Sequence, residues 1–111
     1  MLWYAGTSGY SYKEWLGSFY PDDLRADDML AYYATRLPAV EINNTFYRMP
    51  RTHVMETWRA AVPNEFRFVI KGSRRITHQA KLADTDESVT YLAKRVALLE
   101  DKLACVLLQL P

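Results

Sequence analysis

One stretch of the sequence decides the fold: Val40-Glu41-Ile42-Asn43-Asn44-Thr45-Phe46-Tyr47-Arg48. Val40 and Ile42 alternate with Glu41 and Asn43, so a strand at 39–43 would place apolar side chains on one face and polar side chains on the other. The strand then runs directly into amide, hydroxyl and guanidinium groups. Polar side chains at the end of a strand usually serve binding or chemistry rather than packing.

Two other strand-like runs also end in polar residues. The first run, Leu2 to Gly6, is followed by Thr7-Ser8-Gly9, and a later run, Phe66 to Ile70, is followed by Lys71-Gly72-Ser73-Arg74-Arg75. A fourth run, Leu103 to Leu110, is almost uniformly apolar. We expect such a strand to be covered on both faces, as in a parallel sheet flanked by helices.

Helical patterns separate these strands. Asp27 or Asp28 can cap a helix that carries Leu30, Ala34 and Leu37 on one face and ends at Pro38. A second helix is predicted at 52–61, with an apolar stripe formed by residues 54, 55 and 58. A third is predicted with residue 86 as its cap and residues 89, 92, 96 and 99 on its buried face.

The order β-α-β-α-β-α-β predicts a single α/β unit over residues 1–111, with a parallel sheet and right-handed crossovers. Both open doubly wound sheets and (β/α)8 barrels begin in this way. In the third strand Phe66, Phe68 and Ile70 oppose Arg67, Val69 and Lys71, so one face is apolar and the other is mixed. This contrast favours the first half of a barrel, whose interior admits polar groups, over an open sheet covered on both faces.

Composition is that of an ordinary globular domain, with half of the residues apolar and a formal net charge of +1. Global charge therefore gives no reason to expect a nucleic-acid or membrane partner. Neither a membrane-spanning apolar run nor a signal-peptide pattern occurs, so we expect a cytoplasmic setting. The lone Cys105 lies in an apolar run and is expected to be a small buried side chain.

Four separated motifs resemble the YecE-like family, a (β/α)8-type group known as domain of unknown function seventy-two. They are GTSGYSYKEW (6–15), FYP (19–21), VEINNTFYRMP (40–50) and FRFVIKGSRRITH (66–78). Members of that family are typically more than twice as long as this chain, and they have no established biochemical activity. The resemblance implies the amino-terminal half of a barrel.

A half barrel would leave the outer edges of its first and fourth strands without backbone partners. We therefore expect either that the 111 residues are part of a longer protein or that two copies pair the fourth strand of one with the first strand of the other. A self-contained open α/β sheet is the remaining alternative.

Active sites of barrels lie at the carboxyl ends of the strands, which makes Glu41 and Lys71 the candidate catalytic residues. Both are predicted on the same face of adjacent strands, where they would form a proton-transfer pair or a structural ion pair. Asn43, Thr45 and Gln109 are candidates for orienting a substrate. The remaining candidate binding residues are Thr7, Ser8, Tyr10, Tyr12, Asn44, Tyr47, Arg48, Arg74, Arg75 and His78.

Within this set, the segment 71–78 with Arg48 could cradle a phosphate or carboxylate, with Arg74 and Arg75 as the anion clamp, or could be a solvated basic loop. Tyr10, Tyr12 and Tyr47 are better candidates for contacting a ligand than the aromatic residues at 15, 19 and 20, which we expect to pack on one another.

Two functional classes fit these residues: an enzyme or binding protein for an anionic small molecule, and a module that binds or processes nucleic acid. The second would use the same basic residues on phosphates and the tyrosines on bases. His53 and His78 lack the spacing of a metal site, so no metal is predicted, and no cofactor is indicated.

Overall fold

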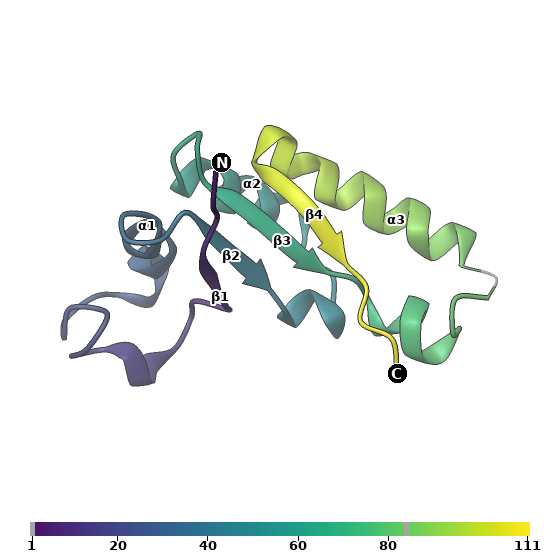
Figure 1. Ribbon diagram of the computed structural model, residues 1–111, viewed down its shortest axis with the longest axis horizontal. Helices are drawn as coiled ribbons and strands as arrows, with labels where there is room; N and C mark the ends of the chain where they lie inside the picture. Colours follow the sequence, from purple (N-terminus) through teal and green to yellow (C-terminus); the bar gives the residue numbers. More distant parts are fainter. Residues whose placement is uncertain (1, 84) are drawn as a thin grey trace.

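The computed structural model describes residues 2–83 and 85–111. Strands β1 (Gly6–Ser8), β2 (Ala39–Ile42), β3 (Arg67–Lys71) and β4 (Leu103–Leu107) form, within these residues, one parallel sheet with the order β1-β2-β3-β4 (Figure 1). The register places Thr7 opposite Val40 and Val40 opposite Phe68. The predicted α/β class and the parallel order of the strands are therefore confirmed.

Helices α1 (Met29–Ala34), α2 (Thr52–Ala61) and α3 (Asp86–Val96) connect these strands. The second helix has the bounds predicted from the sequence, and its Met55 and Trp58 are buried. Short 3₁₀ turns occupy Lys13–Trp15, Ala26–Asp28, Asn44–Phe46 and Ala97–Lys102, and a π-helical turn occupies Arg75–Gln79.

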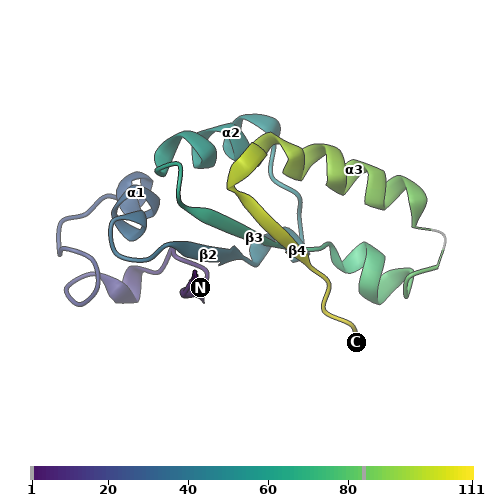
Figure 2. The same cartoon turned by 45° about the horizontal axis from the view of Figure 1, so that its top comes forward.

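All three α-helices lie on one side of the sheet, as the turned view makes plain (Figure 2). The side chains of Val40, Ile42, Phe68 and Ile70 are buried against them, whereas Glu41 on the opposite face is only half-buried. This division follows the two-residue alternation of a strand. The predicted contrast between an apolar and a mixed face in β2 and β3 is confirmed.

Expectations about β4 are corrected. The strand ends at Leu107 rather than Leu110. Its side chains are not covered on both faces, as the 40% exposure of Leu107 shows. Cys105 lies opposite Val69, on the face without α-helices among the described residues, and is exposed rather than buried.

The first strand begins later than predicted. Pairing starts at Gly6, opposite Ala39, and the preceding Leu2 and Trp3 are 84% and 81% exposed. At this end of the ladder the Tyr33 hydroxyl bridges the two strands, since it accepts from the Thr7 amide at 2.9 Å and donates to the Ala39 carbonyl at 2.7 Å. Gly6 is required there because an added Cβ would lie 2.1 Å from the Ala39 carbonyl oxygen.

Two helix starts also differ from the prediction. Asp28 precedes α1 but makes no side-chain capping hydrogen bond, and the residue before α3 is Thr85 rather than Asp86. Val89, expected in the core, is 45% exposed because the first turns of α3 extend beyond the strands (Figure 1). Leu92 and Val96, further along α3, are buried as predicted.

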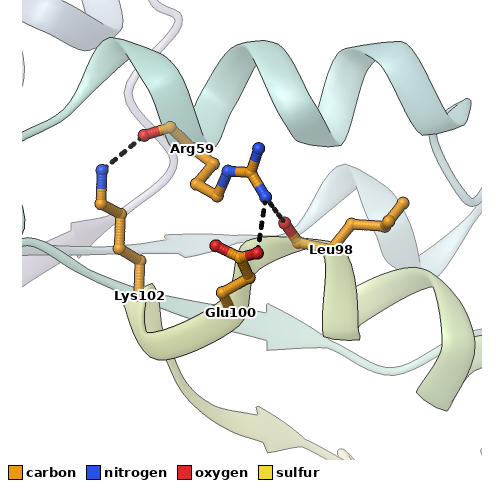
Figure 3. A network of polar contacts seen from close by, with 4 residues as sticks. All are labelled: Arg59, Leu98, Glu100 and Lys102. Atoms are coloured by element: carbon orange, nitrogen blue, oxygen red, sulfur yellow. Dashed lines mark hydrogen bonds and ion pairs between the residues drawn. The ribbon is translucent and has the colours of Figure 1, made fainter.

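A polar network joins the end of α2 to the turn that leads into β4 (Figure 3). The Lys102 ammonium donates to the backbone carbonyls of Arg59 and Val62, each at 2.7 Å. The Arg59 guanidinium donates to the Leu98 carbonyl at 3.2 Å and pairs with the Glu100 carboxylate at 3.2 Å. Lys102 thus satisfies carbonyls that the end of a helix leaves without intrahelical donors.

We predict that Lys102→Met lowers the free energy of unfolding by about 1 to 3 kcal/mol, because two carbonyls lose a charged donor. Urea denaturation of Lys102→Met and of the exposed control Lys94→Met would measure this difference. A control that loses as much stability as Lys102→Met would show that the network contributes nothing specific.

Candidate functional site

The carboxyl ends of β1 and β2 are joined by side chains that the sequence singled out. The Asn43 amide donates to the Ser8 hydroxyl at 2.9 Å, and the Gly9 amide donates to the Glu41 carbonyl at 2.8 Å. Parallel strands end at the same edge of a sheet, so these groups are adjacent although they are far apart in sequence. Ser8 and Asn43 therefore form a polar pair at this edge.

Glu41 and Lys71 share the mixed face of the sheet but do not form the ion pair that we considered. Lys71 lies opposite Leu107 and Glu41 lies opposite Val69. The Lys71 ammonium is instead 4.4 Å from the centroid of the Phe46 ring, and no ion pair links it to Glu41 in the described part of the chain. Lys71 is thus held by a cation–π contact.

Two of the candidate residues have hydroxyls occupied by backbone groups. Thr45 is fully buried, and its hydroxyl lies 2.7 Å from the Lys71 carbonyl and 2.9 Å from the Ile42 carbonyl. The Thr7 hydroxyl donates to the Gly9 carbonyl at 2.7 Å. These contacts hold the loops at the ends of β1, β2 and β3 in place, so neither hydroxyl is directed toward a ligand.

The basic segment after β3 folds back as the π-helical turn 75–79. Its Thr77 is fully buried, with the hydroxyl 2.7 Å from Nδ1 of His78. The His78 ring stands edge-on to Phe46 at 5.0 Å, so His78 and Lys71 both contact that ring. π-Helical turns of this kind often occur at functional sites.

The structure contains a cavity of about 940 Å³ beside the edge of the sheet where the strands have their carboxyl ends. It lies between the loop 44–51, α2 and one side of α3, and its lining includes Ser73 and Arg75. Its charged lining residues are Arg48, Arg51, Arg75, Arg95 and Glu87. A smaller cavity of about 260 Å³ adjoins it and is lined by Tyr10, Tyr12 and Asn43.

Asn44 and Trp58 line both cavities, and Tyr47 lines the larger one. Sequence reasoning missed Arg51, Trp58, Tyr91 and Arg95 as possible site residues. One signal could have found part of this set, because residues 87, 91 and 95 recur every four positions and therefore share one side of α3. Gln109 is exposed beyond the end of β4 and lines neither cavity.

The aromatic residues after β1 form a small core of their own, as predicted. Trp15 contacts Phe19 with ring centroids 5.5 Å apart, and Phe19 contacts Tyr20 at 5.0 Å. Tyr20 is buried, and its hydroxyl donates to the Tyr10 carbonyl. Burial raises the pKa of Tyr20, and the neighbouring Tyr10 and Tyr33 raise it further. Burial also raises the pKa of Tyr10.

These features define a protein with a parallel α/β sheet and polar groups gathered at the carboxyl ends of its strands. The chain belongs to the family described as Protein of unknown function DUF72, whose sequence model matches residues 4–111. The predicted resemblance to the YecE-like family is thereby confirmed.

Similar proteins are known from several bacteria. The UPF0759 protein YecE of Escherichia coli (strain K12) is 37% identical over 82 residues, which cover 74% of this chain and 30% of that protein. The UPF0759 protein YunF of Bacillus subtilis (strain 168) is 28% identical over 114 residues, which cover 97% of this chain and 39% of that protein.

Two solved structures of DUF72 family proteins have a similar fold. TM1631 from Thermotoga maritima superposes with a TM-score of 0.82 at 30% identity, covering 97% of this chain and 44% of that one. EF0366 from Enterococcus faecalis gives a TM-score of 0.74 at 29% identity, covering 96% of this chain and 38% of that one. This chain therefore spans less than half the length of each relative.

Neither a membrane-spanning helix nor a cluster of metal-binding side chains is present in the described residues. None of the helices in residues 2–83 and 85–111 is long and apolar enough to cross a membrane. The same residues contain no group of three or more histidine, cysteine, aspartate or glutamate side chains placed to hold a metal ion.

The raised pKa of Tyr20 gives a prediction for alkaline solution. The Tyr20 hydroxyl holds its proton more tightly in the folded chain than in the unfolded chain. The stabilisation that this provides is fully present below the ordinary tyrosine pKa of 10.0 and is lost as pH rises above it. Urea unfolding measured across this pH range gives the free energy of unfolding at each pH. Its fall with pH should be less steep in Tyr20→Phe, by the slope that corresponds to about one bound proton. Tyr4→Phe, at an exposed ring, should keep the wild-type slope. Equal slopes for both variants would contradict the assignment to Tyr20.

Proposed function

We propose that this protein binds a phosphorylated or otherwise anionic small molecule at the carboxyl ends of its strands. The observation that carries the proposal is the collection of cationic side chains that follow β2 and β3. These are Arg48, Arg74 and Arg75, together with Lys71 at the end of β3, and they are accompanied by His78. The chain as a whole is almost neutral, so this concentration of positive charge is local.

The arrangement of this edge suits an anion in two further ways. Lys71 is positioned by its contact with Phe46, and Arg74 lies 5.9 Å from the Tyr47 ring. Both cations are therefore partly ordered before a ligand arrives, which reduces the entropy cost of binding. Ser8 and Asn43 are already joined by a hydrogen bond and are placed to orient the rest of the ligand.

If the bound molecule reacts, Glu41 is the carboxylate on the mixed face that would act as acid or base, with Lys71 stabilising developing negative charge. This role requires the ligand to lie over the mixed face of β2 and β3, where both side chains are half-buried. Binding is the function that we propose, and catalysis would follow from it through Glu41 and Lys71.

We also propose that the sheet corresponds to the first half of a (β/α)8 barrel. Support comes from the helices on one side, the mixed opposite face, and the outer edges of β1 and β4, which have no strand partner among residues 2–83 and 85–111 (Figure 1). In a longer chain, further strands would pair with those edges. A chain of 111 residues acting alone would instead bury them by pairing β4 of one copy with β1 of another.

The anion-binding proposal predicts the behaviour of a double variant, Lys71→Met with Arg74→Ala. Inorganic phosphate should stabilise the wild-type protein by about 3 kcal/mol when free phosphate exceeds its dissociation constant about 100-fold. The double variant should lose most of this protection, because both cations at the edge are removed. Thermal unfolding with and without phosphate measures the effect.

A matched control removes the same charges elsewhere, through Lys94→Met with Arg36→Ala at exposed positions on α3 and after α1. It should keep the protection by phosphate. The proposal fails if phosphate does not protect the wild type, or if the Lys71 and Arg74 variant is protected as well as the control.

A further inference from the structure

The larger cavity is lined by more positive than negative side chains, unlike the nearly neutral molecule as a whole. Four arginines line it, Arg48, Arg51, Arg75 and Arg95, against the single carboxylate of Glu87. Over the whole sequence, 14 lysines and arginines are balanced by 13 acidic residues. Guanidinium groups that converge on one concave surface repel one another unless an anion lies between them. The lining therefore favours a negatively charged occupant.

One of these arginines is held in place by the fold. The Arg95 guanidinium donates to the Pro50 carbonyl at 2.5 Å and to the Tyr91 hydroxyl at 2.9 Å, and it lies 4.9 Å from the Tyr91 ring centroid. It thereby ties the loop after β2 to the exposed side of α3. A guanidinium has five N–H groups, so donors remain after these two bonds.

The other three arginines lie on the surrounding loops. Arg48 and Arg51 belong to the loop between β2 and α2, and Arg75 begins the turn after β3. Among residues 2–83 and 85–111, none of the three forms an ion pair. Because they approach from two separate loops, their planar forks can reach one phosphate group from different directions.

The floor of the cavity is apolar and aromatic. Trp58 is buried there and stacks on Phe68, with an interplanar angle of 22° and centroids 6.4 Å apart, so its ring is fixed. Val54 and Leu92 complete the floor, and the exposed Tyr47 and Tyr91 stand at the rim. Exposed tyrosine rings beside an apolar floor suit a flat ligand ring.

We propose that this cavity is a binding site for a phosphate monoester joined to a planar ring, a molecule of mononucleotide class. The phosphate would lie among Arg48, Arg51 and Arg75, and the ring would lie against Tyr91 and the floor. A volume of about 940 Å³ is within the range of pockets that enclose small ligands. The site shares Arg48 and Arg75 with the strand-end edge but extends away from it, since Arg51, Tyr91 and Trp58 line the cavity and Lys71 and Arg74 do not.

Calorimetric titration of the full chain with AMP tests this assignment. AMP should bind saturably, and Arg48→Gln and Arg51→Gln should each weaken it about 10-fold or more, because each removes charged hydrogen bonds to phosphate. The exposed control Arg36→Gln should bind AMP like the wild type. Tyr91→Ala should weaken AMP binding, and ribose 5-phosphate, which lacks the planar ring, should bind the wild type more weakly than AMP does.

Three outcomes would overturn the proposal: no saturable binding of AMP, full affinity in Arg48→Gln and Arg51→Gln, or tighter binding of a single-stranded oligonucleotide that weakens steeply with salt. The last would identify a nucleic-acid strand as the occupant. Failure here is separable from failure at the strand ends, because Lys71 and Arg74 do not line the cavity, whereas Arg51 and Tyr91 line the cavity and take no part in the strand-end site.

Discussion

The packing of three helices against a single face of the sheet determines which side chains are available to a ligand. Val40, Ile42, Phe68 and Ile70 fill the interior because strand alternation turns them toward the helices. Every second residue is therefore directed to the opposite face, and Glu41 is placed there by the same geometry. No separate feature of the sequence is needed to expose this carboxylate, because the apolar pattern of its neighbours fixes its direction.

The loops after β2 and β3 depend on that sheet in turn. Thr45 and Gly72 connect them to neighbouring backbone, through the Lys71 carbonyl and the Leu107 carbonyl respectively. An added Cβ on Gly72 would lie 2.5 Å from the end of the half-exposed Leu108 side chain, so a larger residue there would displace that side chain. The residues that follow, including Arg48 and Arg75, leave from anchored positions. Their convergence is a consequence of the parallel register rather than of their distance in sequence.

How much the sequence predicts depends on the range of the interactions involved. The bounds of α2 and the two faces of β2 and β3 follow from local periodicity, and both are correct. Val89 is exposed because α3 begins beyond the strands, and Cys105 is exposed because it lies on the face that carries no α-helix in the described residues. No local pattern in the sequence records either arrangement. The larger cavity is further out of reach, because Arg51 and Arg95 look like ordinary solvated residues until α2 and α3 are placed side by side.

Charge is also separated along the molecule, and this affects both proposed sites. Asp22, Asp23, Asp27 and Asp28 are exposed in the segment before α1, at the opposite end of the long axis from the loop after β3 (Figure 1). The small net charge of +1 thus conceals an acidic segment at one end of the molecule. Such a field would guide an anion toward the arginines and away from the aromatic loop after β1, an effect that salt would screen. Binding that persists at high salt would therefore have to come from direct hydrogen bonds at the two proposed sites, donated by the guanidinium groups of Arg48, Arg51 and Arg75 in the cavity and by the ammonium of Lys71 at the strand ends.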